Sequence, residues 1–179
     1  MQHDVFLPGP ARSILPSFLE RLEDVYAQID EAYEAAADQC GFVCTGCEEN
    51  CCLTRFHHHT LLEYFHLKEG FDRLSDSERT SASRRAESVL QAYQAADTAG
   101  KPPRAMCPVN VENRCRLYRH RPMICRMHGI PHVLRPGGRA PVVGPGCAAF
   151  AERCKNPTAA VFDRTPFYRK MAALEQEMR

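Results

Sequence analysis

Ten cysteines fall into two segments of this 179-residue chain, and their distribution constrains the fold more than any other feature. Five lie between positions 40 and 52 in the spacing C-x3-C-x2-C-x3-C-C, and the other five follow after 54 residues without a cysteine. Thiols two or three positions apart can direct several sulfur atoms toward one point, as a metal ion or cluster requires. The sequence therefore predicts a thiol-ligated metal centre to which both cysteine segments contribute.

Length and composition favour a single domain over residues 1–179. No run of about 18 apolar residues is present, so we expect no membrane span. The first residues lack a basic start followed by an apolar stretch, which argues against a secretory signal and for a cytoplasmic location. In that reducing compartment, clustered cysteines are more often metal ligands than disulfides.

The net charge of +1 conceals two oppositely charged segments. Residues 1–50 hold 10 acidic against 2 basic side chains, whereas residues 101–150 hold one acidic against 9 basic ones. Because the whole chain is nearly neutral, we expect these segments to compensate each other rather than to form a nucleic-acid surface. A site built from several thiolates is also negative, and nearby arginines would offset its charge.

Apolar residues recur at steps of three and four over residues 12–38, which predicts a long amphipathic helix. Gly41 follows closely and suits a helix end. Further on, Thr60 with Glu63 forms a capping-box pattern, which predicts the start of a short helix. His66 is expected on the surface of that helix.

The helical pattern of the middle of the chain ends at Lys-Pro-Pro, residues 101–103. Ser75 with Glu78 repeats the capping-box pattern and predicts a polar helix that ends near Gly100. Lys-Pro-Pro at 101–103 then interrupts the chain. Residues 104–163 show little periodicity, so we expect a metal to supply the order that apolar burial alone does not.

The last part of the chain predicts one more helix. Thr165 followed by Pro166 is typical of an N-cap with proline in the first helical position, and it predicts a helix over residues 165–179. The expected fold class is therefore mainly α: a small helical frame around an irregular, metal-organised cysteine core at residues 40–154.

The second cysteine segment carries the most specific motif. Cys107 is followed by proline, and Cys115 and Cys125 enclose the sequence Arg-Leu-Tyr-Arg-His-Arg-Pro-Met-Ile. Together with the first segment, over residues 44–126, this pattern resembles the YkgJ-like cysteine-cluster family, which is described as zinc- or iron-chelating. The family pattern in the first segment is C-x2-C-x2-C-C, and this chain has one additional residue before its adjacent cysteines.

The resemblance implies metal chelation and no particular reaction. The additional residue leaves open which of the adjacent cysteines takes the equivalent ligand position. Two cysteines, Cys40 and Cys154, lie outside the shared pattern and are left unassigned. The ligands that the resemblance implies, with the last one added after the core motif, are Cys44, Cys47, Cys51, Cys52, Cys107, Cys115, Cys125 and Cys147.

Ligand spacing favours an iron–sulfur cluster over zinc. Structural zinc commonly takes two separated C-x2-C pairs, and Cys44 with Cys47 is the single such pair in the sequence. The adjacent side chains of Cys51 and Cys52 tend to point apart, which suits a larger cluster better than one small ion. Zinc is the alternative, and the number of thiols also allows two metal sites.

Histidines and arginines near the cysteines are weighed as further site residues. His57, His58 and His59 directly precede the helix predicted at Thr60 and are interpreted as solvent-exposed rather than as ligands. His128 and His132 lie on either side of Pro131, which opposes the helix that would be needed to align their side chains on one metal. Five arginines are expected to pair with acidic residues of the first helix. The alternative is that they bind an anionic substrate or change the reduction potential of a cluster. These arginines are Arg114, Arg116, Arg119, Arg121 and Arg126.

Three functions follow, in order of preference. The first is a metal-binding protein whose iron–sulfur cluster serves electron transfer or redox sensing. The second is a structural zinc module that presents a surface to a protein partner. The third is a metal-dependent enzyme of unknown substrate, which no G-x-S-x-G elbow, phosphate-binding glycine loop or H-E-x-x-H zinc helix supports. The expected partners are a metal ion or cluster and a protein, without nucleic acid or membrane.

Overall fold

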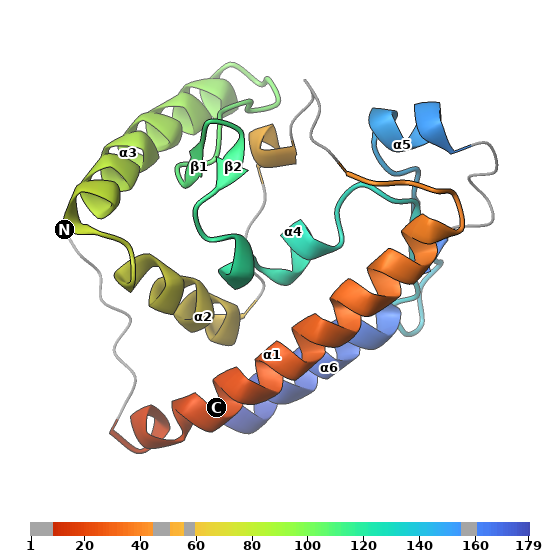
Figure 1. Cartoon of the computed structure of the whole chain (residues 1–179), viewed down its shortest axis with the longest axis horizontal. Helices are drawn as coiled ribbons and strands as arrows, with labels where there is room; N and C mark the ends of the chain where they lie inside the picture. The colour runs from red at the N-terminus through yellow and green to blue at the C-terminus, as the bar shows by residue number, and fades with distance from the viewer. Residues whose placement is uncertain (1–8, 45–50, 56–59, 155–160) are drawn as a thin grey trace.

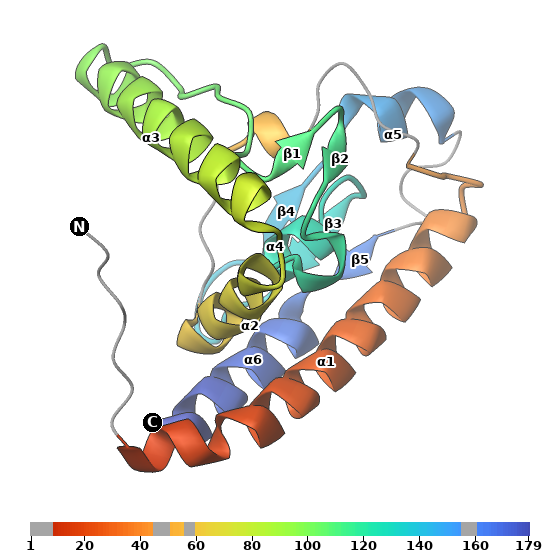
Figure 2. The ribbon, with the colours of Figure 1, turned by 60° about the vertical axis from the view of Figure 1, so that its left-hand side comes forward.

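Two long helices, one from each end of the described chain, form one side of the molecule. The computed structural model describes residues 9–44, 51–55, 60–154 and 161–179, with side chains for all of these except residues 9–12 and Cys51. Helix α1 (Gly9–Asp38) and helix α6 (Thr165–Met178) run side by side in opposite directions (Figures 1 and 2). The helix predicted at 12–38 is confirmed and begins three residues earlier.

The apolar stripe of α1 forms the core together with α6 and the centre of the chain. Its side chains follow the three–four spacing, so one face of the helix is buried along most of its length. Gly41, with φ of +60°, ends the helix as the N–H of Phe42 donates to the Ala37 carbonyl at 3.0 Å. The largest fully buried apolar residues are Leu22, Ile29, Leu62, Met123, Met127, Ile130, Phe150 and Met171.

Helices α2 (Leu61–Asp72) and α3 (Asp76–Thr98) begin as their caps predict. The Ser75 capping box is complete, with both reciprocal hydrogen bonds present. At the other cap, the Thr60 hydroxyl accepts the Glu63 N–H, but the Glu63 carboxylate accepts the N–H of Met123 at 2.7 Å. The capping box predicted at Thr60 is therefore only half formed: the Thr60 hydroxyl caps the helix, but the Glu63 carboxylate accepts a hydrogen bond in the core.

Helix α3 extends from the rest of the molecule as an arm (Figure 2). Among its described side chains, Ala82 is the one that is buried. Polar contacts hold it at two positions: near its middle, Arg85 Nε donates to the Pro108 carbonyl at 2.6 Å, and near its C-terminal end Asp97 pairs with Arg55 at 2.9 Å. The helix thus depends on the cysteine-rich segments that it contacts.

The irregular region contains short strands that the sequence did not predict. Strands β1 and β2 form an antiparallel hairpin, and a second sheet has the order β4-β3-β5, with β3–β4 antiparallel and β3–β5 parallel. The fold is nonetheless mainly α, as predicted. The short elements are η1 (Cys51–Leu53), β1 (Asn110–Val111), β2 (Arg114–Cys115), η2 (Tyr118–His120), α4 (Met123–Arg126), β3 (His132–Leu134), β4 (Val142–Gly144), α5 (Ala148–Arg153) and β5 (Phe162–Asp163).

The last helix begins within the predicted range 165–179, but its N-cap lies one residue earlier than the sequence pattern predicts. Arg164 takes the N-cap position and Thr165 is the first helical residue. The Thr165 hydroxyl accepts the N–H of Arg135 at 2.8 Å, so it serves the strand region beside the helix. Thr165, which the sequence suggested as the N-cap, therefore links the start of α6 to the residue that follows β3.

Two cysteines outside the family motif are bonded to each other. Cys40, just after α1, forms a disulfide with Cys154, at the end of α5. This pair departs from the expectation that the cysteines serve as ligands rather than disulfides. No helix in the described part of the chain combines the length and apolarity needed to cross a membrane.

Candidate metal centre

The backbone brings four predicted ligands from three separate segments to one region, and we call them the four-thiol group. The N–H of Cys107 donates to the carbonyl of Cys52 in η1 at 2.8 Å. The hairpin pairs Asn110 with Cys115, and the N–H of Asn110 donates to the Cys107 carbonyl at 2.9 Å. Cys125 follows on α4. The four-thiol group is Cys52, Cys107, Cys115 and Cys125.

Electrostatics connect these thiols to one another. Burial raises the pKa of the Cys107 and Cys115 thiols, and the neighbouring thiols raise it further. Burial also raises the pKa of Cys125, to which the other three members of the group all contribute. Four thiolates this close together need a compensating cation, because burial and mutual repulsion both oppose their charge. A metal bound by these thiols would supply that charge.

Two arginines, Arg85 and Arg121, lie near the four-thiol group. The Arg85 charge acts to lower the pKa of Cys107, and the Arg121 charge does the same for Cys115 and Cys125, although burial outweighs both. Arg121 itself lies over the Tyr118 ring, 3.7 Å from its centroid. Positive charge near a thiolate site offsets its negative charge and raises the reduction potential of a cluster.

The predicted pairing of these arginines with the first helix is confirmed at one position. Arg126 is buried and pairs with Asp30 of α1, and it also donates to the carbonyls of Arg119 and Arg121. Arg116 pairs instead with Glu78 of α3, at 3.9 Å. The basic segment therefore bridges α1 and α3.

The donor chemistry fits a thiophilic metal, since four thiols without carboxylates suit zinc or iron–sulfur. Among the side chains that the structure describes, however, no group of three or more Cys, His, Asp or Glu is arranged to hold a metal ion. Cys47 and the side chain of Cys51 lie outside the described residues. The described thiols are thus near one another without forming a closed coordination shell.

The remaining predicted residues lie in other places. Cys44 is exposed in the segment after α1. Cys147 is the N-cap of α5, and its N–H donates to the Gly129 carbonyl at 2.9 Å. His128 and His132 lie near the Arg164 charge, which together with burial lowers their pKa values. His57, His58 and His59 lie outside the described residues.

A buried polar network beside Cys125 was not predicted. Glu63, 1% exposed, accepts hydrogen bonds from Met123 N and from the Tyr26 hydroxyl at 3.5 Å. The Arg126 guanidinium lies over the Tyr26 ring, 4.2 Å from its centroid. His66 is 2% exposed, so its predicted surface position is wrong. The network anchors the short helix that carries Cys125 to α1 and α2.

A comparison with protein families identifies the pattern. The model of the CxxCxxCC family, a putative zinc- or iron-chelating domain, matches residues 43–136, which is more than half of the chain. The chain belongs to this family. As a CxxCxxCC protein it is a metal-binding protein, and the matched region includes the whole four-thiol group but neither member of the disulfide. No curated protein and no solved structure matched the chain.

Proposed function

We propose that this CxxCxxCC protein holds an iron–sulfur cluster on the four-thiol group. The observation that supports this proposal best is the convergence of four thiols from η1, the hairpin and α4, no two of which form a C-x2-C pair. Iron–sulfur clusters accept thiolates from irregularly spaced loops. Cys44, Cys47, Cys51 and Cys147 are the further candidates for ligand positions.

The open arrangement of the described thiols favours a cluster over a single ion. A lone zinc ion needs its sulfurs about 2.3 Å from one point, whereas a cluster extends over several atoms and accepts sulfurs from wider separations. The thiols influence one another electrostatically without three of them closing on a common point. That combination is compatible with a larger group bound between the segments.

The surroundings of the proposed cluster support a redox role. The four-thiol group is half-buried beside Arg85 and Arg121, and both burial and nearby charge set the potential of a cluster. We therefore propose electron transfer or redox sensing in the cytoplasm. In that compartment Cys40 and Cys154 would be reduced, which leaves the four-thiol group unchanged.

A structural zinc site is the alternative function. It is supported by the all-thiol donor set and by the position of the thiols between α3 and the remaining helices, where one ion would fasten the arm. In that case the protein would present its surface to a protein partner. An enzymatic function on an unknown substrate has weaker support.

Metal identity distinguishes the two proposals directly. The full chain, purified without oxygen, should be brown, absorb at about 400 nm and contain acid-labile sulfide with iron. A colourless protein with one zinc per chain would overturn the cluster and support the structural alternative. Failure to take up either zinc or reconstituted iron and sulfide would contradict both. Metal analysis together with an acid-labile sulfide assay, on the purified and on the reconstituted protein, distinguishes the three outcomes.

A further inference from the structure

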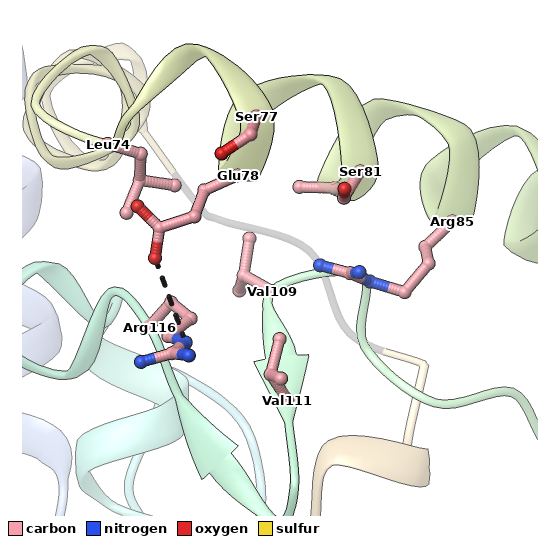
Figure 3. A pocket seen from close by; sticks show the side chains of 9 residues that line it. Leu74, Ser77, Glu78, Ser81, Arg85, Val109, Val111 and Arg116 are labelled. Carbon is pink, nitrogen blue, oxygen red and sulfur yellow. Dashed lines mark ion pairs between the residues drawn. The ribbon is translucent and has the colours of Figure 1, made fainter.

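A cavity opens between α3 and the β1–β2 hairpin (Figure 3). Two of its lining residues, Val109 and Arg116, lie within two positions of Cys107 and Cys115 in the chain. Its volume is about 200 Å³, which is room for roughly six or seven water molecules at about 30 Å³ each. The sequence explains the opening: Ser77, Ser81 and Ala82 place small side chains on the face of α3 toward the hairpin. Val109 and Val111, two positions apart in the extended chain, form the opposite wall.

Arg85 is held in position at one end of this cavity. Its Nε donates to the Pro108 carbonyl at 2.6 Å, and no other hydrogen bond of Arg85 is found among the described residues. Figure 3 shows its guanidinium reaching from α3 toward Val109. The two Nη groups therefore present a fixed donor edge at the cavity, the geometry with which arginine binds a carboxylate through two hydrogen bonds.

The other charged residues of the lining determine which ligand charge the cavity favours. Arg116 lies across the cavity and pairs with Glu78 at 3.9 Å. Hydrogen bonds from Ser75 hold the pKa of Glu78 below its usual value, so this carboxylate is ionised and already engaged. Two guanidiniums against one carboxylate leave the lining with a net positive charge, which favours an anion.

We infer that this cavity binds a small monocarboxylate with a short branched alkyl group. The carboxylate would lie on the Nη edge of Arg85, with the serine hydroxyls as further donors, and the alkyl group would lie between the apolar walls. Leu74, Ala82, Val109 and Val111 supply those walls. Inorganic phosphate offers charge without an apolar part and would leave the valine wall without a partner.

The test is a titration of the metal-loaded full chain with isobutyrate, in which binding is measured by saturation-transfer NMR of the isobutyrate signals. Metal is retained because the hairpin that carries the valine wall also carries Cys115, with Cys107 just before it. Isobutyrate should bind saturably, and the neutral isobutyramide should bind at least about tenfold more weakly, since it loses the charge-assisted contact. Inorganic phosphate should compete weakly.

Two variants locate the site. Arg85→Gln should weaken isobutyrate binding about tenfold or more, whereas Arg84→Gln, an exposed neighbour outside the cavity, should leave it unchanged. Because Arg85 also holds α3, Ser81→Leu provides a second test: it fills the cavity, keeps both arginines and should abolish binding.

Three results would overturn the inference: isobutyramide binding as tightly as isobutyrate, phosphate competing at lower concentration than isobutyrate, or Ser81→Leu retaining full affinity. Absence of saturable binding would overturn it as well. None of these results depends on which metal is bound, so the inference and the proposed function fail independently.

Discussion

Replacing Cys125 with serine should remove most of the bound metal and loosen the β1–β2 hairpin from α4. Cys125 contributes the one thiol of the four-thiol group that lies on α4, next to Arg126 of the buried network. Structural zinc binding is worth about 10–16 kcal/mol over four ligands, so for zinc one ligand accounts for roughly 2.5–4 kcal/mol, or on the order of a hundredfold in affinity. Competition with a chelator of known affinity, monitored by elemental analysis, measures this loss.

Cys147→Ser is the matched comparison for this prediction. Its side chain packs at the edge of the core beside Gly129, and its ligand assignment rests on a weaker part of the family pattern. The serine variant should therefore lose less metal than Cys125→Ser. Equal losses in the two variants, or full metal content in Cys125→Ser, would mean that the four-thiol group is not the principal site.

Glu63→Ala should destabilise the protein strongly without touching a predicted ligand. The substitution leaves the Met123 N–H and the Tyr26 hydroxyl without their acceptor in the core, where both residues are at most 2% exposed. Each unsatisfied buried donor costs about 1–3 kcal/mol, so we expect a total loss of about 2–6 kcal/mol for the two donors. Denaturant unfolding of the reduced, metal-loaded protein gives the free energy of unfolding.

Glu63→Gln controls for the acceptor itself. A glutamine oxygen can still accept from Met123 N, so this variant should retain most of the stability that alanine loses. If glutamine and alanine were equally destabilising, the negative charge rather than the hydrogen bond would be the important property. If neither were destabilising, the network would not anchor α4.

The helices were predictable because their signals are local. The stripe of α1, the Ser75 capping box and the Lys-Pro-Pro break each act within a few residues, and the structure contains all three features. The family motif could also be recognised from the sequence, because the second cysteine segment has the spacing of the family pattern. Convergence of the thiols was expected in outline, although the sequence did not distinguish the four-thiol group from the other cysteines.

The hairpin and the buried network could not be predicted, because their causes are not local. The β1–β2 turn places Glu112 and Asn113 at φ of +52° and +61°, whereas glycine is the usual second residue of such turns. His66 looks like a surface residue until Tyr26 and His120 pack against it from α1 and η2. Glu63 looked like a cap for the same reason: its partner, Met123, is 60 residues away.

The spacing of the four thiols has a consequence for how the protein matures. Between Cys52 and Cys107 lie 54 residues that include all of α2 and α3, so the centre closes a large loop around two helices. The last thiol of the group comes 18 residues after Cys107, on α4. If the four-thiol group holds the metal as proposed, a ribosome-bound chain cannot complete the coordination until α4 has emerged, so the proposal predicts that the metal is loaded only after residue 125 has left the ribosome.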